Sequence, residues 1–154
     1  MPRDYLLWIA TAFYAGHILE EYVYDWKTWA SKTIHIEVKW EFFYLVNAAV
    51  IVLGISCASV SWKLPEFSLI YPALMAINAV FFHILPSLVR RKYAPGLITA
   101  VVLFLPLAAV IYVTAAQDGV LTTRALIIST LGAALTMAYP ILLLMTKDRP
   151  FFQS

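Results

Sequence analysis

The chain has 154 residues, of which 62% are hydrophobic and only 13% are charged, and its formal net charge is +2. About a quarter of the residues of a soluble globular domain are charged, so this composition excludes an ordinary soluble domain and indicates a lipid bilayer as the solvent. The sequence has no basic run typical of nucleic-acid binding, and its single cysteine excludes an internal disulfide and a multi-cysteine metal site.

Five segments are long and apolar enough to cross a membrane as helices. A crossing helix needs about 20 apolar residues, and windows of about that length follow one another with short connections between them. The predicted fold is therefore all-α, a polytopic membrane helical bundle with a single transmembrane domain over residues 1–154. The five spans are expected at residues 5–24, 42–60, 67–89, 97–116 and 125–145.

The connection between the first two spans is the least lipid-like part of the chain. Its residues 33–39 alternate polar and apolar side chains, as an interfacial strand or a lid would. Tyrosine and tryptophan residues surround this connection, which is typical of the headgroup level of a membrane. We therefore expect the connection to lie on the membrane surface without crossing it.

The distribution of lysine and arginine predicts the orientation of the bundle. With five spans, the amino terminus lies on the same side as the second and fourth connections. The basic residues of that side are Arg3, Lys63 and Arg124, and those of the opposite side are Lys27, Lys32, Lys39, Arg90, Arg91, Lys92, Lys147 and Arg149. Because cytoplasmic loops are enriched in basic residues, we expect the N-terminus outside and the C-terminus in the cytoplasm, in a multi-pass protein of the cell (inner) membrane.

Three ionisable residues, His17, Glu20 and Glu21, lie in the last turns of the first span. A charge at the centre of a membrane helix costs about 2.5–3.5 kcal/mol, so such groups face protein or water. His17 precedes Glu20 by three residues and Glu21 by four, so the three side chains converge on one side of a helix. This spacing permits metal ligation from a single helix and is similar to the Glu-x-x-His pattern of di-iron bundles.

Polar residues of the second and third spans fall at the same depth as this cluster. Because successive spans run in opposite directions, these residues and the first-span cluster all occupy the cytoplasmic third of the bilayer. The predicted metal ligands and catalytic groups are His17, Glu20, Glu21 and His83. The predicted supporting residues are Glu41, Asn47, Asn78 and Tyr93. On an ideal α-helix Asn78 and His83 would lie about 140° apart, and a kink at Pro86 would change that relation.

Three motifs stand in order along the chain: His17-Ile18-Leu19-Glu20-Glu21, then Asn78-Ala79 followed by His83, then Tyr93-Ala94-Pro95-Gly96. With these motifs the sequence resembles the HXXEE family of small bacterial and archaeal integral membrane proteins. The family pattern spaces the asparagine–alanine pair and the histidine one residue closer than this chain does. The resemblance implies a multi-pass protein with these hallmark residues, and it implies no particular activity.

The first predicted function is an intramembrane metal-dependent enzyme that acts on a lipid-like or apolar small molecule. Two histidines with carboxylates suit zinc or non-haem iron, whose open coordination position activates water or oxygen. The expected cofactor is therefore a divalent metal, zinc or iron. The expected partners are the lipid bilayer and a hydrophobic small-molecule substrate, with no nucleic acid, and a homo-oligomer is left open.

Other functions would use the same residues. A carboxylic acid kept protonated by burial would support a metal-free acid–base isomerase or cyclase of sterol or terpene type. A relay of the same groups would serve a metal-ion or proton transporter, and in a non-catalytic partner protein the buried charges would only specify helix packing. In the simplest structural alternative, Glu21 reaches the membrane surface and pairs with Lys27 or Lys32.

Overall fold

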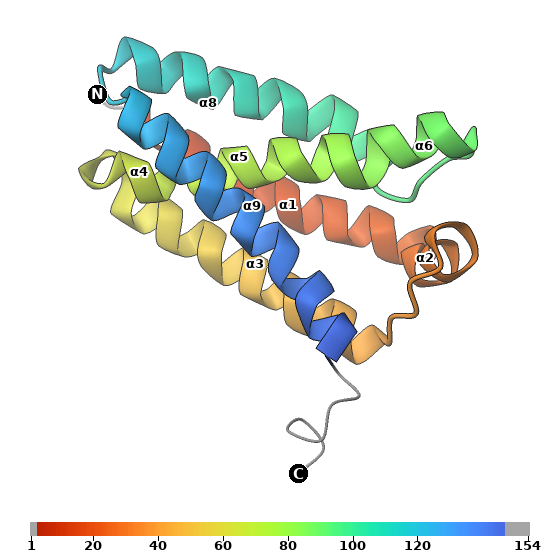
Figure 1. The fold of residues 1–154 in the computed structure, drawn as a ribbon. Coiled ribbons are helices and arrows are strands. Elements are labelled where there is room, and N and C mark those ends of the chain that lie inside the picture. Colours follow the sequence, from red (N-terminus) through yellow and green to blue (C-terminus); the bar gives the residue numbers. More distant parts are fainter. Residues whose placement is uncertain (1–2, 147–154) are drawn as a thin grey trace.

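The computed structural model describes residues 3–146, and every regular element in that range is a helix, which confirms the all-α prediction (Figure 1). The elements in chain order are α1 (Leu6–Val23), α2 (Trp26–Ile34), α3 (Trp40–Val60), η1 (Ser61–Lys63), α4 (Pro65–Ser68), α5 (Ile70–Ile77), η2 (Asn78–Ile84), α6 (Leu85–Arg90), α7 (Leu97–Thr99), η3 (Ala100–Phe104), α8 (Leu105–Gln117) and α9 (Thr123–Thr146).

Within residues 3–146, four segments are long and apolar enough to cross a membrane. They are Trp40–Lys63, Pro65–Arg90, Leu97–Gln117 and Thr123–Leu142, and they correspond to the second to fifth predicted spans. The first predicted span forms α1 but is not among them. This helix has only 18 residues and carries three ionisable side chains near its end. It nevertheless belongs to the bundle, because it packs against α3, α5 and α8.

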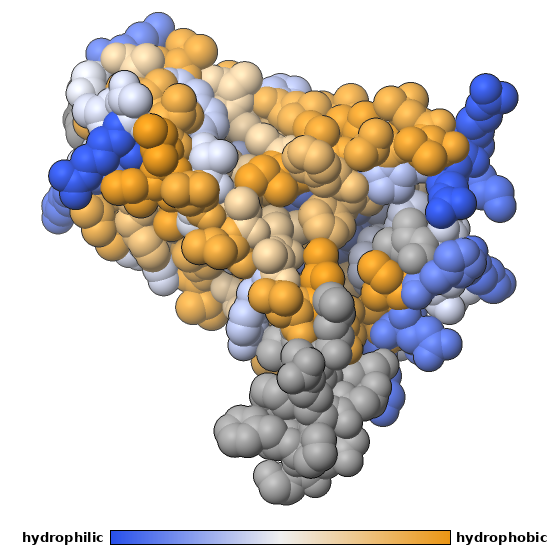
Figure 2. All heavy atoms as spheres, in the orientation of Figure 1, coloured by the Kyte–Doolittle hydropathy of each residue, from blue (hydrophilic) through white to orange (hydrophobic). Residues whose placement is uncertain are grey.

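The bundle has polar ends and an apolar middle. Figure 2 shows hydrophobic side chains over the central part of the visible face and hydrophilic side chains gathered at its two ends. At the end that holds the amino terminus, the Arg3 guanidinium lies 3.2 Å from a carboxylate oxygen of Asp118. The indole nitrogen of Trp62 donates to the same carboxylate at 3.2 Å. These contacts place the amino terminus at the same end of the bundle as the second and fourth connections. The number of membrane crossings and the cytoplasmic assignment of the other end stay predictions.

The first connection contains a short helix, α2, and the strand that the alternation of residues 33–39 suggested is not formed in the described chain, whereas a lid stays a prediction. Helix α2 begins after Asp25, whose carboxylate accepts a hydrogen bond from the backbone nitrogen of Thr28 at 3.3 Å. It ends at His35, which adopts a left-handed conformation with φ of 58°. The first two residues of the alternating segment belong to this helix, and residues 35–39 have no partner strand in the described chain.

Two π-helical segments, η2 and η3, interrupt the third and fourth spans. Each stands just before a proline, Pro86 or Pro106, whose ring would clash in an α-helix with the carbonyl group four residues earlier. A π-helical turn bonds residues five apart and so relieves this clash. Residues five apart then share one face, which places Asn78 and His83 on the same side of the helix. Both are buried, and the separation of about 140° expected for an ideal α-helix does not apply.

Gly54 brings α1, α3 and α5 close together. A Cβ atom at this position would lie 2.5 Å from Cζ of Tyr71 and 2.7 Å from Oγ1 of Thr11. Tyr71 is fully buried, so its ring has no space into which to move. We expect Gly54→Ala to lower the free energy of unfolding by about 1–3 kcal/mol, as overpacking of a core does. The measurement is the thermal unfolding midpoint of the protein in mild detergent.

The matched control for this substitution is Gly16→Ala in α1. A Cβ atom at position 16 would meet nothing within 4 Å, and alanine favours a helix over glycine by about 0.5–1 kcal/mol. The unfolding midpoint of Gly16→Ala should therefore stay the same or rise. Equal midpoints for the two variants would contradict the close packing at Gly54.

Candidate functional site

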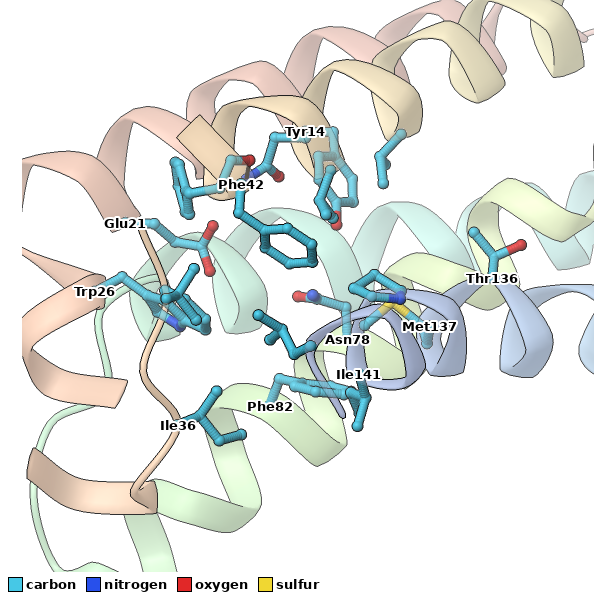
Figure 3. A pocket seen from close by; sticks show the side chains of 17 residues that line it. Tyr14, Glu21, Trp26, Ile36, Phe42, Asn78, Phe82, Thr136, Met137 and Ile141 are labelled. Carbon is cyan, nitrogen blue, oxygen red and sulfur yellow. Dashed lines mark hydrogen bonds between the residues drawn. The ribbon is translucent and has the colours of Figure 1, made fainter. Parts of the chain in front are cut away.

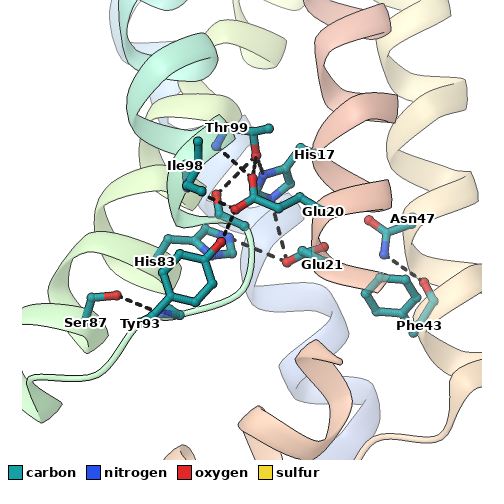
Figure 4. Close-up of polar contacts among 12 residues, drawn as sticks. His17, Glu20, Glu21, Phe43, Asn47, His83, Ser87, Tyr93, Ile98 and Thr99 are labelled. Carbon is teal, nitrogen blue, oxygen red and sulfur yellow. Dashed lines mark hydrogen bonds and ion pairs between the residues drawn. The ribbon is translucent and has the colours of Figure 1, made fainter. Parts of the chain in front are cut away.

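Two histidines and one glutamate meet in the interior of the bundle. His17 and Glu21 lie one turn apart on α1, and His83 faces them from η2 (Figure 4). The Nε2 atom of each histidine lies 3.6 Å from Oε1 of Glu21. Both histidines are fully buried, and Glu21 is 6% exposed. We call these three residues the His–Glu triad.

The donor atoms of the His–Glu triad fit a metal ion. Neither Nε2 atom has a hydrogen-bond partner, and one ligand atom from each of the three residues lies within 4.8 Å of the others. In a tetrahedral site with metal bonds of about 2.0–2.1 Å, neighbouring ligand atoms are about 3.3 Å apart. The two 3.6 Å nitrogen–oxygen distances therefore need only a small contraction, and the histidine–histidine pair lies within the 4.8 Å limit of the set. Since buried polar atoms are rarely left without partners, a cation between the three side chains would satisfy them.

Glu20 points to a different partner, the chain segment that starts the fourth span. The Oε1 atom of Glu20 accepts two hydrogen bonds, one from the backbone nitrogen of Ile98 at 3.1 Å and one from the hydroxyl of Tyr93. The other oxygen accepts from the backbone nitrogen of Thr99 at 2.8 Å and from its hydroxyl at 2.5 Å. The first backbone N–H groups of a helix have no partner within that helix. Glu20 therefore caps α7 from the neighbouring helix α1.

Tyr93 contributes a protonated hydroxyl to this cap. Partial desolvation and the neighbouring carboxylate of Glu20 raise the pKa of Tyr93 above its ordinary value. The phenol therefore keeps its proton and donates a hydrogen bond to Glu20.

Gly96 lies directly against the two imidazole rings of the triad. It adopts a left-handed conformation with φ of +93°, and a Cβ atom there would lie 2.6 Å from Cε1 of His83 and 2.7 Å from Cε1 of His17. The preceding residues Ala94 and Pro95 are also buried. The motif at residues 93–96 therefore covers the histidine pair, and only a residue without a side chain fits at its last position.

Thr99 links Glu20 to the triad, and no sequence motif marks it as a site residue. Its Oγ1 lies 2.7 Å from Nδ1 of His17. A hydroxyl has one proton, and the charged carboxylate of Glu20 at 2.5 Å is the stronger acceptor for it. The hydroxyl oxygen then accepts from Nδ1–H of His17, which leaves the lone pair on Nε2, the atom that faces Glu21. Histidines that bind metals are commonly held in one tautomer in this way.

An apolar cavity of about 120 Å³ lies beside Glu21 (Figure 3). Its walls come from α1, α2, α3, η2, α9 and the segment that precedes α3, and rings such as those of Tyr14 and Phe42 form much of the lining. Asn78 lines the cavity and is 7% exposed, and its Oδ1 has no hydrogen-bond partner. Glu21 therefore separates this cavity from the two histidines.

The other predicted supporting residues lie farther from the triad. Asn47 lines the cavity, but its amide donates to the backbone oxygen of Phe43 at 3.0 Å. Glu41 is exposed on the first turn of α3. It is not one of the described residues that line the cavity, and it is not part of the triad.

The ion pair of Glu21 with Lys27 or Lys32, which the sequence left open, is not formed. Glu21 turns inward to the histidines, and the ammonium group of Lys27 lies over the ring of Trp40, 6.0 Å from its centroid. Both lysines line a separate surface depression beside α2.

Comparison with known proteins gives a family but no activity. Residues 8–111 match the family described as "Protein of unknown function with HXXEE motif", a range that holds the triad, Glu20 and the segment that covers the histidines. The chain is 37% identical over 70 residues to "Uncharacterized protein YrkK" of Bacillus subtilis (strain 168), and the similar region spans 44% of each protein. No solved structure matches the chain.

Proposed function

The chain belongs to the HXXEE family, and from that premise we propose that it is an intramembrane metal-dependent enzyme acting on a lipid-like or apolar small molecule. One observation carries this proposal. Ligand atoms from the buried residues His17, Glu21 and His83 converge, the Nε2 atoms of both histidines have no hydrogen-bond partner, and Glu21 also lines an apolar cavity. A metal site and a place for a substrate would then share one residue.

The ligand set supports this choice of chemistry. Two histidines and one carboxylate hold the ion in several catalytic zinc sites and in non-haem iron sites, where at least one coordination position stays open. A zinc or iron ion bound here would activate water or oxygen. Other residues of the chain prepare the site. The segment with Gly96 shields the histidine rings from water, and Thr99 holds His17 in the tautomer whose Nε2 has a free lone pair for the metal.

The surroundings of the cavity support an apolar substrate. Part of its wall comes from α3 and α9, which belong to two of the segments able to cross a membrane. A molecule dissolved in the bilayer would enter between these helices and reach Glu21 without passing through water. In this proposal the chain is a multi-pass protein of the cell (inner) membrane.

The first test is the metal content of the purified protein. We expect elemental mass spectrometry of the protein in mild detergent to find about one zinc or iron ion per chain. The substitutions His17→Ala, Glu21→Gln and His83→Ala should each reduce the occupancy at least tenfold, because each removes one of three ligands. The folded state of each variant is checked by size-exclusion chromatography and circular dichroism.

The control for these variants is His35→Asn. His35 is the third histidine of the chain, and it lies exposed at the end of α2, far in sequence from the triad. Asparagine tolerates the left-handed conformation found there, so this variant should keep its metal. A wild-type protein that stays metal-free after reconstitution with zinc and with ferrous iron would contradict the proposal.

A metal-free wild type would favour the second candidate, acid–base isomerisation. The observation behind it is the position of Glu21, a buried carboxyl group that lines the cavity with two histidines behind it. A carboxylic acid in such a place donates or removes protons on an apolar substrate without a metal.

A further inference from the structure

The cavity beside Glu21 contains a hydrogen-bond acceptor that the protein does not use. Asn78 is more than nine-tenths buried, and its Oδ1 has no partner in the described chain. Figure 3 shows its carboxamide pointing into the cavity toward the side on which Glu21 lies. A buried amide oxygen without a partner is unfavourable, and a donor group on a bound molecule would satisfy it.

The remaining polar groups of the cavity exclude an acidic ligand. Among the described residues that line it, Glu21 is the charged one, and no lysine or arginine is present. The other polar lining residues are uncharged: Asn47 donates to Phe43 at 3.0 Å, Thr136 donates to Gly132 at 2.8 Å, and Tyr14 and Trp26 bring a hydroxyl and an indole N–H. A phosphate or carboxylate head would therefore face a carboxylate without a cation to offset the repulsion. A neutral head with one hydrogen-bond donor fits this lining, because the donor satisfies Oδ1 of Asn78 and the head brings no negative charge next to Glu21.

The shape of the cavity limits the tail of the ligand. At about 120 Å³ it is smaller than the 300–1,000 Å³ typical of drug-sized ligand pockets, so it has room for a small head and the first part of one chain. A fused ring system is too large for it. The cavity is not fully enclosed, and Val46 of α3 and Met137, Pro140 and Ile141 of α9 give it apolar sides. A longer chain would therefore extend between these helices into the bilayer.

We propose that this cavity binds an uncharged single-chain alcohol, whose hydroxyl donates to Oδ1 of Asn78 beside Glu21 and whose chain lies between α3 and α9. This inference names the substrate class of the proposed enzyme, and it rests on that proposed function for the claim that the bound alcohol is a substrate. Its binding step is measured without turnover, which keeps the two proposals separable.

The test is photolabelling of the protein in lipid nanodiscs with a ten-carbon alcohol that carries a diazirine at its far end. We expect the label to attach to α3 and α9 residues of the cavity wall, as mapped by peptide mass spectrometry. An excess of 1-decanol should reduce this labelling at least fivefold, whereas equal concentrations of decanoate or decyl phosphate should not. Asn78→Leu should weaken the competition by 1-decanol at least fivefold, because it removes the acceptor and keeps the size.

A pair of tryptophan substitutions on α9 provides the matched control. Met137→Trp fills the cavity and should abolish the saturable labelling. Leu135→Trp makes the same change two residues away at a side chain that is 72% exposed, and it should leave the labelling intact. Unchanged labelling of Met137→Trp, or equal competition by decyl phosphate, would overturn the inference.

The metal measurement tells the two failures apart. Saturable alcohol labelling of a protein that binds no metal would leave this inference standing and remove the metalloenzyme. A metal-loaded protein without saturable labelling would leave the metalloenzyme standing and remove the alcohol site.

Discussion

Gly96→Ala is expected to displace the two histidines of the triad and to lower the free energy of unfolding by about 2–5 kcal/mol. The left-handed backbone at φ of +93° costs a residue with a side chain about 1–2 kcal/mol. Collision of the new methyl group with the two rings adds about 1–3 kcal/mol, since overpacked cores lose about that much. The rings of His17 and His83 are fully buried and pack against each other, and the His17 ring also contacts Phe104. Thermal unfolding and metal content measured on one preparation check both effects.

Gly119→Ala separates the two costs. Gly119 also has a positive φ, +73°, but a Cβ atom there would meet nothing within 4 Å. This variant should lose only the backbone cost of about 1–2 kcal/mol and should keep its metal. If Gly96→Ala unfolds at the same temperature as Gly119→Ala and binds as much metal, then residues 93–96 do not pack tightly against the two histidines.

The core of the site could be predicted because it depends on local spacing and depth. His17 and Glu21 are four residues apart, so they share a helix face whatever surrounds them. His83 follows from the alternation of span directions, which brings its part of the third span to the same level. The structure brings these three residues together.

The separate position of Glu20 could not be predicted from the same rules. Adjacent residues on an α-helix point about 100° apart, so Glu20 and Glu21 cannot both face one neighbour directly. Only the position of the fourth span decides which one meets the histidines, and a sequence pattern does not give that position. Thr99 escaped notice for the same reason, because its role comes from a contact with a helix about 80 residues earlier.

The common face of Asn78 and His83 could not be predicted from the spacing of an ideal α-helix, because both residues lie in a π-helical segment. In an α-helix, a residue shares its face with the residue four positions later. In a π-helix, it shares its face with the residue five positions later. Asn78 and His83 are five residues apart and both lie in η2, so its wider turn places the two side chains on one face.

Glu20→Gln is expected to loosen the start of the fourth span and to lower the free energy of unfolding by about 2–3 kcal/mol. Both carboxylate oxygens accept hydrogen bonds from a backbone N–H group and a hydroxyl. Whichever way a glutamine amide turns, its NH₂ group meets the N–H of Ile98 or Thr99. A hydrogen bond to a charged group contributes about 1.5–3 kcal/mol, and at least one is lost. Amide hydrogen exchange at Ile98 and Thr99 should therefore speed up at least tenfold.

The same variant tests whether Glu20 acts on the triad through Thr99. Without the charged acceptor, the hydroxyl of Thr99 is free to donate to Nδ1 of His17, which would move the ring proton to Nε2 and turn a ligand atom into a donor. Nitrogen-15 shifts of the His17 ring in the metal-free protein should report this change. Glu37→Gln alters an exposed glutamate outside the helices and should change neither the exchange rates nor the ring shifts. Faster exchange with unchanged ring shifts would limit Glu20 to capping the helix, whereas a change in both would make it a positioning residue of the metal site.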